Sequence, residues 1–222
     1  MSQFIIILVF IVVIVAIIKY AKKMEKERSE SIERIAQNMG FQFESNPTVD
    51  YLKKYSNFQL FNSGHSKKIR NLMFIDGIST SAATEKKEIF GYQYRTGNGK
   101  HSSTYMFTIV SFRFSEHKFT DFDLRPEHIF HKIGGVFGYQ DIDIDSDPEF
   151  SKIYLLQGRN EKAIRNIFTP KICEILVEQK PLCIESRDNT MIFYQQYNRL
   201  APEEIHPFYD EARKIYDEFC NV

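Results

Sequence analysis

FIIILVFIVVIVAII (Phe4–Ile18) is an apolar run that no polar side chain interrupts. The run reaches about eighteen residues if Tyr20 and Ala21 are counted and the Lys19 ammonium turns toward the lipid head groups. At ~1.5 Å per residue, a helix of this length just crosses the ~30 Å hydrocarbon layer of a bilayer. The run therefore predicts a transmembrane anchor over residues 1–21, with the lipid bilayer as the partner of residues 4–21.

Two other interpretations of the run fit its surroundings less well. A helix buried in a protein core normally keeps a polar stripe, which this run lacks. A cleavable signal peptide starts with basic residues and ends at a small-residue site, whereas here no Lys or Arg precedes Phe4 and Lys-Tyr-Ala-Lys-Lys follows the run. By the positive-inside rule, Lys19, Lys22 and Lys23 predict a single-pass signal anchor with the following domain in the cytoplasm.

Composition narrows the function only slightly. The chain has 222 residues with 29 Lys and Arg against 29 Asp and Glu, so it lacks the basic excess of a typical nucleic-acid-binding protein. Its three cysteines, Cys173, Cys183 and Cys220, have no zinc-site spacing and lie in apolar patterns. Buried free thiols suit a reducing compartment, which agrees with a cytoplasmic domain.

Residues 22–40 predict a juxtamembrane helix. Oppositely charged residues lie four positions apart, and an apolar stripe ends at Gly40, a typical helix C-cap; the stripe consists of Ile32, Ile35, Ala36 and Met39. We expect the last two turns of this helix to pack on the domain. Its first part could instead form a stalk or an oligomerising seam, which leaves a homo-oligomer open, although fewer than three heptads are present.

The remaining residues, 41–222, predict one α+β domain in which several helices pack on an antiparallel sheet. Strands are expected over 41–44, 58–61, 69–74, 88–95 and 105–114, with a brief helix over 49–55 and a hairpin loop over 96–100. The second half predicts a helix over Pro126–Phe137, a strand near 153–156, helices from Glu161 and from Pro170, a hairpin at Asp188-Asn189 and a final helix from Pro202.

The segment Asp141-Ile-Asp-Ile-Asp-Ser-Asp-Pro-Glu149 concentrates five carboxylates, and oxygen-rich loops of this kind bind hard cations such as Ca²⁺. The candidate metal ligands are Asp141, Asp143, Asp145 and Asp147. An EF-hand loop needs Gly where Ser146 stands and Glu where Lys152 stands, so the match fails in detail. The alternation of Asp with Ile equally describes a half-buried strand with a solvated acidic face.

Other candidate motifs are incomplete. His128 and His131 lie three apart beside Glu127, whereas a zincin helix needs its histidines four apart, so exposed or capping roles are the simpler interpretation. Gly97-Asn-Gly-Lys-His101 resembles a phosphate loop only in its glycines and lies between two strand patterns, which favours a hairpin tip. We assign no catalytic residue and no cofactor.

Basic residues gather in two places. The lysines at the end of the anchor are expected to contact lipid head groups, where each contributes about 1 kcal/mol near an anionic leaflet. The second cluster is predicted to lie in a loop, where solvation is its simplest role; it consists of His65, Lys67, Lys68 and Arg70.

The segments 122–130, 137–143 and 150–158 resemble those of a group of uncharacterised bacterial membrane-anchored proteins, and the resemblance covers roughly Gly40 to the end. It implies a bacterial inner-membrane setting and transfers no activity, cofactor or site residue. The leading hypothesis is a membrane-anchored cytoplasmic domain with a non-enzymatic protein-interaction or scaffolding role and an unknown protein partner. The alternative is a cation-dependent hydrolase or cation-binding domain that uses Asp141–Glu149.

Overall fold

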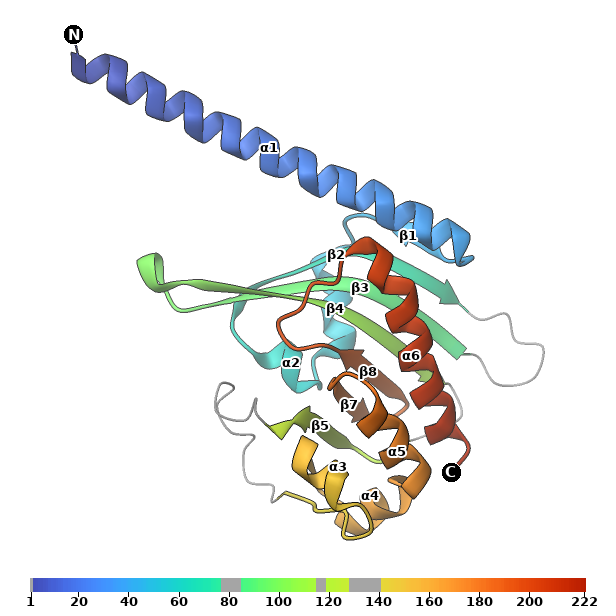
Figure 1. Ribbon diagram of the computed structural model, residues 1–222. Helices are drawn as coiled ribbons and strands as arrows, with labels where there is room; N and C mark the ends of the chain where they lie inside the picture. The colour runs from blue at the N-terminus through green and yellow to red at the C-terminus, as the bar shows by residue number, and fades with distance from the viewer. Residues whose placement is uncertain (1, 77–84, 115–118, 128–140) are drawn as a thin grey trace.

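One antiparallel sheet organises the domain (Figure 1). The computed structural model describes residues 2–76, 85–114, 119–127 and 141–222. In this part of the chain the sheet has eight strands in the order β1-β2-β3-β4-β8-β7-β5-β6, and every neighbouring pair is antiparallel. The strands are β1 (Gln42–Glu44), β2 (His65–Asp76), β3 (Glu85–Thr96), β4 (Ser103–Phe114), β5 (Phe122–Pro126), β6 (Tyr154–Gly158), β7 (Cys183–Arg187) and β8 (Thr190–Tyr194).

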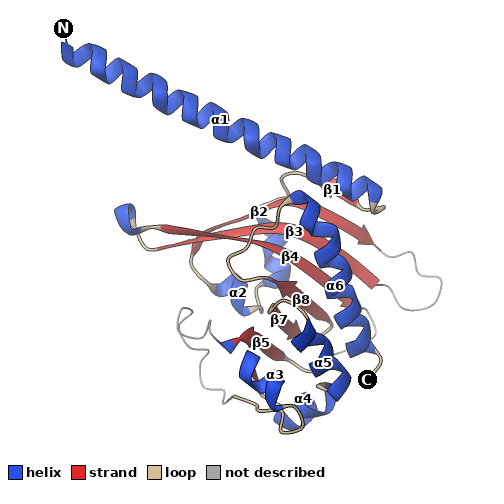
Figure 2. Ribbon diagram, in the orientation of Figure 1, coloured by secondary structure: helices blue, strands red, loops and turns tan. Residues whose placement is uncertain are grey.

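Helices cover both faces of this sheet, as Figure 2 shows. The helices of the described chain are α1 (Ser2–Asn38), η1 (Val49–Tyr55), α2 (Gln59–Asn62), η2 (Gly99–His101, at the tip of the β3–β4 hairpin), α3 (Pro148–Ile153), α4 (Glu161–Ile167), α5 (Pro170–Glu178) and α6 (Pro202–Cys220). One hydrophobic cluster joins α6, α5, α3 and the end of α1 to one face, and a second, aromatic cluster joins η1 and α2 to the other. The predicted α+β fold is thus confirmed.

Helix α1 is a continuous helix of 37 residues that passes through the expected end of the anchor at residue 21. Side chains from Phe4 to Met24 are exposed, and the most apolar window of the helix is 0% buried within the protein. Its C-terminal turns do pack as expected, because Ile32 and Ala36 are buried against α6 and the sheet. Gly40, at φ +74°, ends the helix in the left-handed conformation that glycine favours.

Two predicted elements of the domain are wrong. The strand expected over 58–61 is replaced by the short helix α2 (Gln59–Asn62) with Phe58 as its N-cap, although Phe58, Leu60 and Phe61 are buried as the apolar pattern indicated. Pro126 ends strand β5 instead of opening a helix, and residues 128–137 of that predicted helix lie outside the described residues.

The second half follows the sequence more closely. The hairpin at Asp188 is confirmed, with a φ of 52° at that residue, and so are α4 and the final helix from Pro202. Pro170 starts α5, and the Thr169 hydroxyl accepts a hydrogen bond from the Ile172 N–H at 3.4 Å. Helix α3, which precedes the expected strand β6, was not predicted.

Candidate functional site

Polar contacts fix the C-terminal half of α1 to the domain, and they begin at Glu25, two residues beyond Lys23. The two carboxylate oxygens of Glu25 accept hydrogen bonds from Arg199, at 2.6 and 2.7 Å. One turn further, Arg28 donates to the Leu200 carbonyl at 2.5 Å, and the Ser29 hydroxyl donates to the Asn71 amide oxygen at 2.8 Å. Together with the buried stripe of α1, these contacts hold the helix and the sheet as one unit from Glu25 onward.

The Asn71 contact depends on an irregularity in β2. The register of β2 against β3 shifts between Arg70 and Met73, and Asn71 has a φ of 51°. Asparagine tolerates this left-handed conformation better than most residues. The bulge turns the backbone of Asn71 toward Ser45, whose carbonyl accepts its N–H at 2.9 Å, and brings its amide side chain within reach of α1.

Beside this attachment, the sheet carries a shallow cleft that is open to solvent. A second hollow continues from it beneath α1. Gly91 and Arg199 line both hollows. The outer part, which we call the juxtamembrane cleft, is lined by Lys68, Arg70, Gly91, Tyr92, Gln93, Met106, Phe107 and Arg199.

Strand register explains why these side chains converge. Arg70 lies opposite Gly91 in the β2–β3 ladder, and Lys68 lies opposite Gln93. Residues two apart on a strand point to the same face, so both cations stand above a floor from which Gly91 contributes no side chain. Met106 pairs with Gln93 in the β3–β4 ladder and forms the rim, where it is 37% exposed.

The cleft is strongly cationic. Burial and the neighbouring Arg199 lower the pKa of the Arg28 guanidinium, which lines the inner hollow. The hydrogen bonds from Arg199 lower the pKa of Glu25, so this carboxylate stays ionised and balances one of the cations. Among the described residues, neither Lys68 nor Arg70 has an ion-pair partner within 4 Å, and both side chains are at least partly exposed.

The prediction that the second basic cluster lies in a loop is wrong. Its four residues lie in strand β2 and not in a loop. Strand alternation sends Lys68 and Arg70 into the cleft, whereas Lys67 donates to the Phe61 carbonyl at 2.6 Å. His65 contacts the Gly97 carbonyl at 3.0 Å and so joins β2 to the β3–β4 hairpin, whose tip is η2, as expected for residues 96–100.

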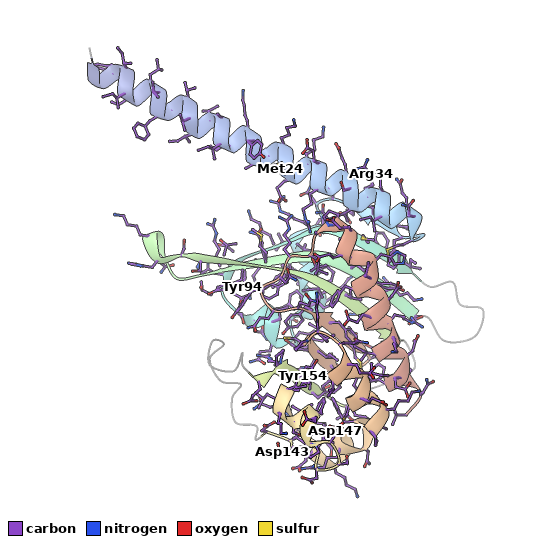
Figure 3. The ribbon with its side chains drawn as sticks, in the orientation of Figure 1. Met24, Arg34, Tyr94, Asp143, Asp147 and Tyr154 are labelled. Atoms are coloured by element: carbon purple, nitrogen blue, oxygen red, sulfur yellow. The ribbon has the colours of Figure 1, made fainter. Side chains whose placement is uncertain are left out.

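The acidic segment lies at the end of the domain farthest from α1, where Figure 3 labels Asp143 and Asp147. Its carboxylates serve separate local roles. Asp141 accepts from the Leu156 N–H at 3.1 Å, and burial raises the pKa of this carboxyl. Asp147 caps α3 by accepting from the Phe150 N–H at 3.0 Å, and Asp145 pairs with Arg165 at 3.4 Å.

Burial alternates along this segment as the sequence indicated, although residues 141–144 do not form a strand. Ile142 and Ile144 are each 4% exposed, and the Ile142 N–H donates to the Leu156 carbonyl of the edge strand β6 at 2.8 Å. In the described part of the chain, no group of three or more His, Cys, Asp or Glu side chains is arranged to hold a metal ion. Cation binding stays a prediction, which a melting-temperature shift with Ca²⁺, Mg²⁺ or Mn²⁺ would test. His128 and His131 lie outside the described residues.

Sequence reasoning missed a buried charged network on the face that η1 and α2 cover. The Glu185 side chain is 0% exposed and accepts hydrogen bonds from the N–H groups of Gln59 and Leu60, at 2.6 and 3.1 Å, and from the Tyr194 hydroxyl at 2.8 Å. Arg125 lies 3.6 Å from this carboxylate. Burial raises the pKa of Glu185, as does Asp123, while Arg125 and the Tyr194 hydroxyl act in the opposite direction.

The network continues to the end of β7, where Arg187 makes a two-pronged ion pair with Asp123 at 2.8 and 2.9 Å. Each charge is thus matched by a neighbour of opposite sign, which is the arrangement of a structural clamp between α2 and the sheet. The alternation Phe122-Asp-Leu-Arg places Asp123 and Arg125 on the same face of a strand, and this pattern was the available sequence signal.

The cysteines divide into two kinds. Cys173 and Cys183 are buried as expected, and burial raises the pKa of each thiol to about 12. Cys220 is exposed near the end of α6, so the expectation of burial is wrong for this residue. Its pKa is also raised, chiefly by partial burial.

Comparison with known proteins gives a fold relationship. The sequence matches no protein-family model and no curated protein. Among solved structures, the crystal structure of the mycobacterial trehalose monomycolate transport factor A, TtfA, is similar, with a TM-score of 0.60 over 86% of this chain and 92% of that chain. This chain shares its fold with TtfA. The two sequences are 13% identical, so the likeness to TtfA concerns the fold alone.

Proposed function

We propose that this protein is a non-enzymatic interaction module, held by α1 against the cytoplasmic face of a bacterial inner membrane, where it binds another protein. The observation that carries the proposal is the attachment of α1 to the domain at Glu25 and Arg28, directly after the anchor. An anchor on a loose linker would leave the domain free to move away from the membrane. Here, the apolar helix continues without interruption into the domain.

The position of the attachment along α1 supports this placement. Glu25 lies four residues beyond Ala21, or ~6 Å along a helix. The polar layer of one leaflet is about 5–8 Å thick. For a helix that spans the bilayer with residues 4–21, Glu25 and Arg199 therefore lie at head-group level. The lysines at the end of the anchor then lie closer to the hydrocarbon layer; they are Lys19, Lys22 and Lys23. The β3–β4 hairpin extends toward the same side as the N-terminal half of α1 (Figure 1).

Two further observations favour a binding role over catalysis. The buried carboxylates Glu88, Asp123 and Glu185 each accept a hydrogen bond or pair with a cation, as in the Glu185–Arg125 network, which indicates structural roles for them. TtfA is named a transport factor, and we extend a role of this kind, in place of catalysis, to this chain. The surface left for a partner is the end of the domain away from the bilayer, around Asp145 and Lys162.

Orientation can be measured with a native thiol. Cys220 is the exposed cysteine, whereas Cys173 and Cys183 are buried. We expect a membrane-impermeant maleimide to label Cys220 only after the cells are permeabilised, and to label a Ser2→Cys variant of a Cys220→Ser background in intact cells. Labelling of Cys220 in intact cells would place the domain outside and refute this part of the proposal.

The interaction role is tested by photo-crosslinking in intact membranes. A photoreactive residue at Asp145 or Lys162 should give a discrete adduct with another protein, whereas at Lys100, on the hairpin tip, it should label lipid. An adduct of twice the monomer mass would identify a second copy of this chain as the partner. Absence of adducts from every exposed position, together with turnover of a substrate by the purified full-length protein, would overturn the proposal in favour of an enzyme.

A further inference from the structure

We propose that the juxtamembrane cleft binds the phosphate-bearing head group of an anionic membrane lipid. This inference rests on the proposed placement of the domain at the membrane surface. It assigns a ligand to Lys68 and Arg70, which otherwise present two cations to solvent on the same face of one strand.

The cleft offers hydrogen-bond donors in excess of acceptors. The Lys68 ammonium has three donors and the Arg70 guanidinium has five, and neither group can accept a hydrogen bond. Gln93 adds amide donors from the neighbouring strand, and Arg199 adds positive charge although Glu25 occupies its fork. A phosphate group, with several acceptor oxygens and a negative charge, is the ligand that such a set of groups recognises.

The spacing of the two cations suits a group of phosphate size. Lys68 and Arg70 are two residues apart on β2, a separation of ~6.6 Å along a strand. Gly91 lies opposite Arg70, and its missing side chain leaves the floor between the strands open. An added Cβ at Gly91 would meet the Arg70 carbonyl oxygen at 3.4 Å, an ordinary contact, so alanine fits the backbone and fills part of the cleft.

A lipid is favoured over a free anion by the position of the cleft. Its Arg199 is attached to α1 at Glu25, which lies at head-group level in the proposed orientation. Met106 is 37% exposed at the rim, where its sulfur lies 4.0 Å from the Arg199 guanidinium, and its side chain offers an apolar contact to the glycerol and upper acyl region of a lipid. Free phosphate would use the same donors but would gain nothing from this rim.

The test uses the full-length protein in a neutral detergent. Bound phosphatidylglycerol and phosphatidylcholine are counted by native mass spectrometry over a lipid titration, with inorganic phosphate as a competitor. Gly91→Ala and the double variant Lys68→Gln/Arg70→Gln are compared with wild type. The matched control is Lys180→Gln/Lys214→Gln, which removes two exposed positive charges away from the cleft. Equal melting temperatures confirm that the variants are folded.

We expect one phosphatidylglycerol to bind before any phosphatidylcholine does. The Lys68→Gln/Arg70→Gln variant should bind it about 30-fold more weakly, since each basic group near an anionic lipid contributes roughly a factor of five. Gly91→Ala should weaken binding about threefold by occupying the floor. The control should bind as wild type, because lipids around the anchor lysines are common to all four proteins.

Three results would overturn the inference. Wild-type affinity in Gly91→Ala would mean diffuse attraction to basic residues instead of a formed site. An equal loss in the control would point to net charge alone. Displacement of the lipid by millimolar inorganic phosphate would identify the ligand as a free anion. The Cys220 labelling experiment is independent of lipid counting, so a wrong orientation and a missing lipid site can be distinguished.

Discussion

Replacing Glu185 with alanine should destabilise the protein more than any surface charge deletion. The carboxylate is 0% exposed, accepts from two helix N–H groups and one hydroxyl, and lies 3.6 Å from Arg125. Removing one partner of a buried ion pair costs about 3–5 kcal/mol, because the other charge stays buried without full compensation. We expect a loss of stability within this range, because Arg125 then keeps only the more distant Asp123 as a counterion, at 3.9 Å.

The assay is thermal melting of the full-length protein in detergent, followed by circular dichroism. For a chain of this size the loss corresponds to a fall of roughly 6–20 °C in melting temperature. Glu161→Ala is the control, because it removes an exposed carboxylate that pairs with Arg165 within α4, worth less than about 0.5 kcal/mol. Glu185→Gln should fall between the two, since it keeps one acceptor oxygen and loses the charge.

Hydrogen exchange at two amides distinguishes the loss of this clamp from a general loss of stability. Glu185 accepts from the N–H groups of Gln59 and Leu60, so these two amides should exchange hydrogen faster in Glu185→Ala before the sheet amides do. A melting temperature within 2 °C of wild type, or unchanged exchange at both amides, would refute the view that Glu185 holds α2 on the sheet.

Three further outcomes are expected. In the native protein only Cys220 should react with a charged thiol reagent and all three cysteines should react after denaturation, which is counted by mass spectrometry and is required for the orientation assay. Gly99 has a φ of +57° and open space around it, so Gly99→Ala should lower the free energy of unfolding by about 1 kcal/mol in melting experiments. Gly64 has a φ of +59°, and Gly64→Ala should cost roughly 1–3 kcal/mol more because its Cβ would lie 2.3 Å from a backbone oxygen. Because the pKa of Glu25 is lowered in the folded protein, its carboxylate stabilises the fold fully at pH values above the unfolded-state pKa near 4.5. This contribution is lost as the pH falls through the folded-state pKa, so the melting temperatures of wild type and Glu25→Gln should differ at pH 7 and converge in acid.

The periodic spacing of apolar residues was sufficient to predict several helices and strands. The final helix, the β7–β8 hairpin and the docking stripe of α1 all follow from residue spacing. The short helix α2 does not, because its conformation depends on hydrogen bonds to Glu185, which is 126 residues from Gln59 in the chain. The Phe-Gln-Leu-Phe sequence of residues 58–61 alternates well enough for a strand, and tertiary contacts decided otherwise.

The acidic segment also contains the sequence signal of a helix start. Asp147-Pro-Glu149 has the N-cap, N1 proline and first-turn acid that start a helix, and α3 begins there. The juxtamembrane cleft, in contrast, could not be found from sequence. It requires Arg70 to face Gly91, and that register depends on two irregularities in β2, of which neither leaves a simple periodic trace.

A formal net charge of zero concealed the arrangement that matters for the proposed role. The 29 basic and 29 acidic residues cancel in number but not in position. Lys68, Arg70 and Arg199 gather beside α1, whereas the Asp141–Glu149 segment lies at the opposite end of the domain (Figure 3). In the proposed orientation an anionic leaflet attracts the first group, and the acidic segment lies at the far end of the domain from it, so the separation of charge agrees with the α1 attachment. Because screening leaves a range of about 8 Å at physiological salt, the field acts on cations at head-group level, which in the proposed orientation include those of the cleft.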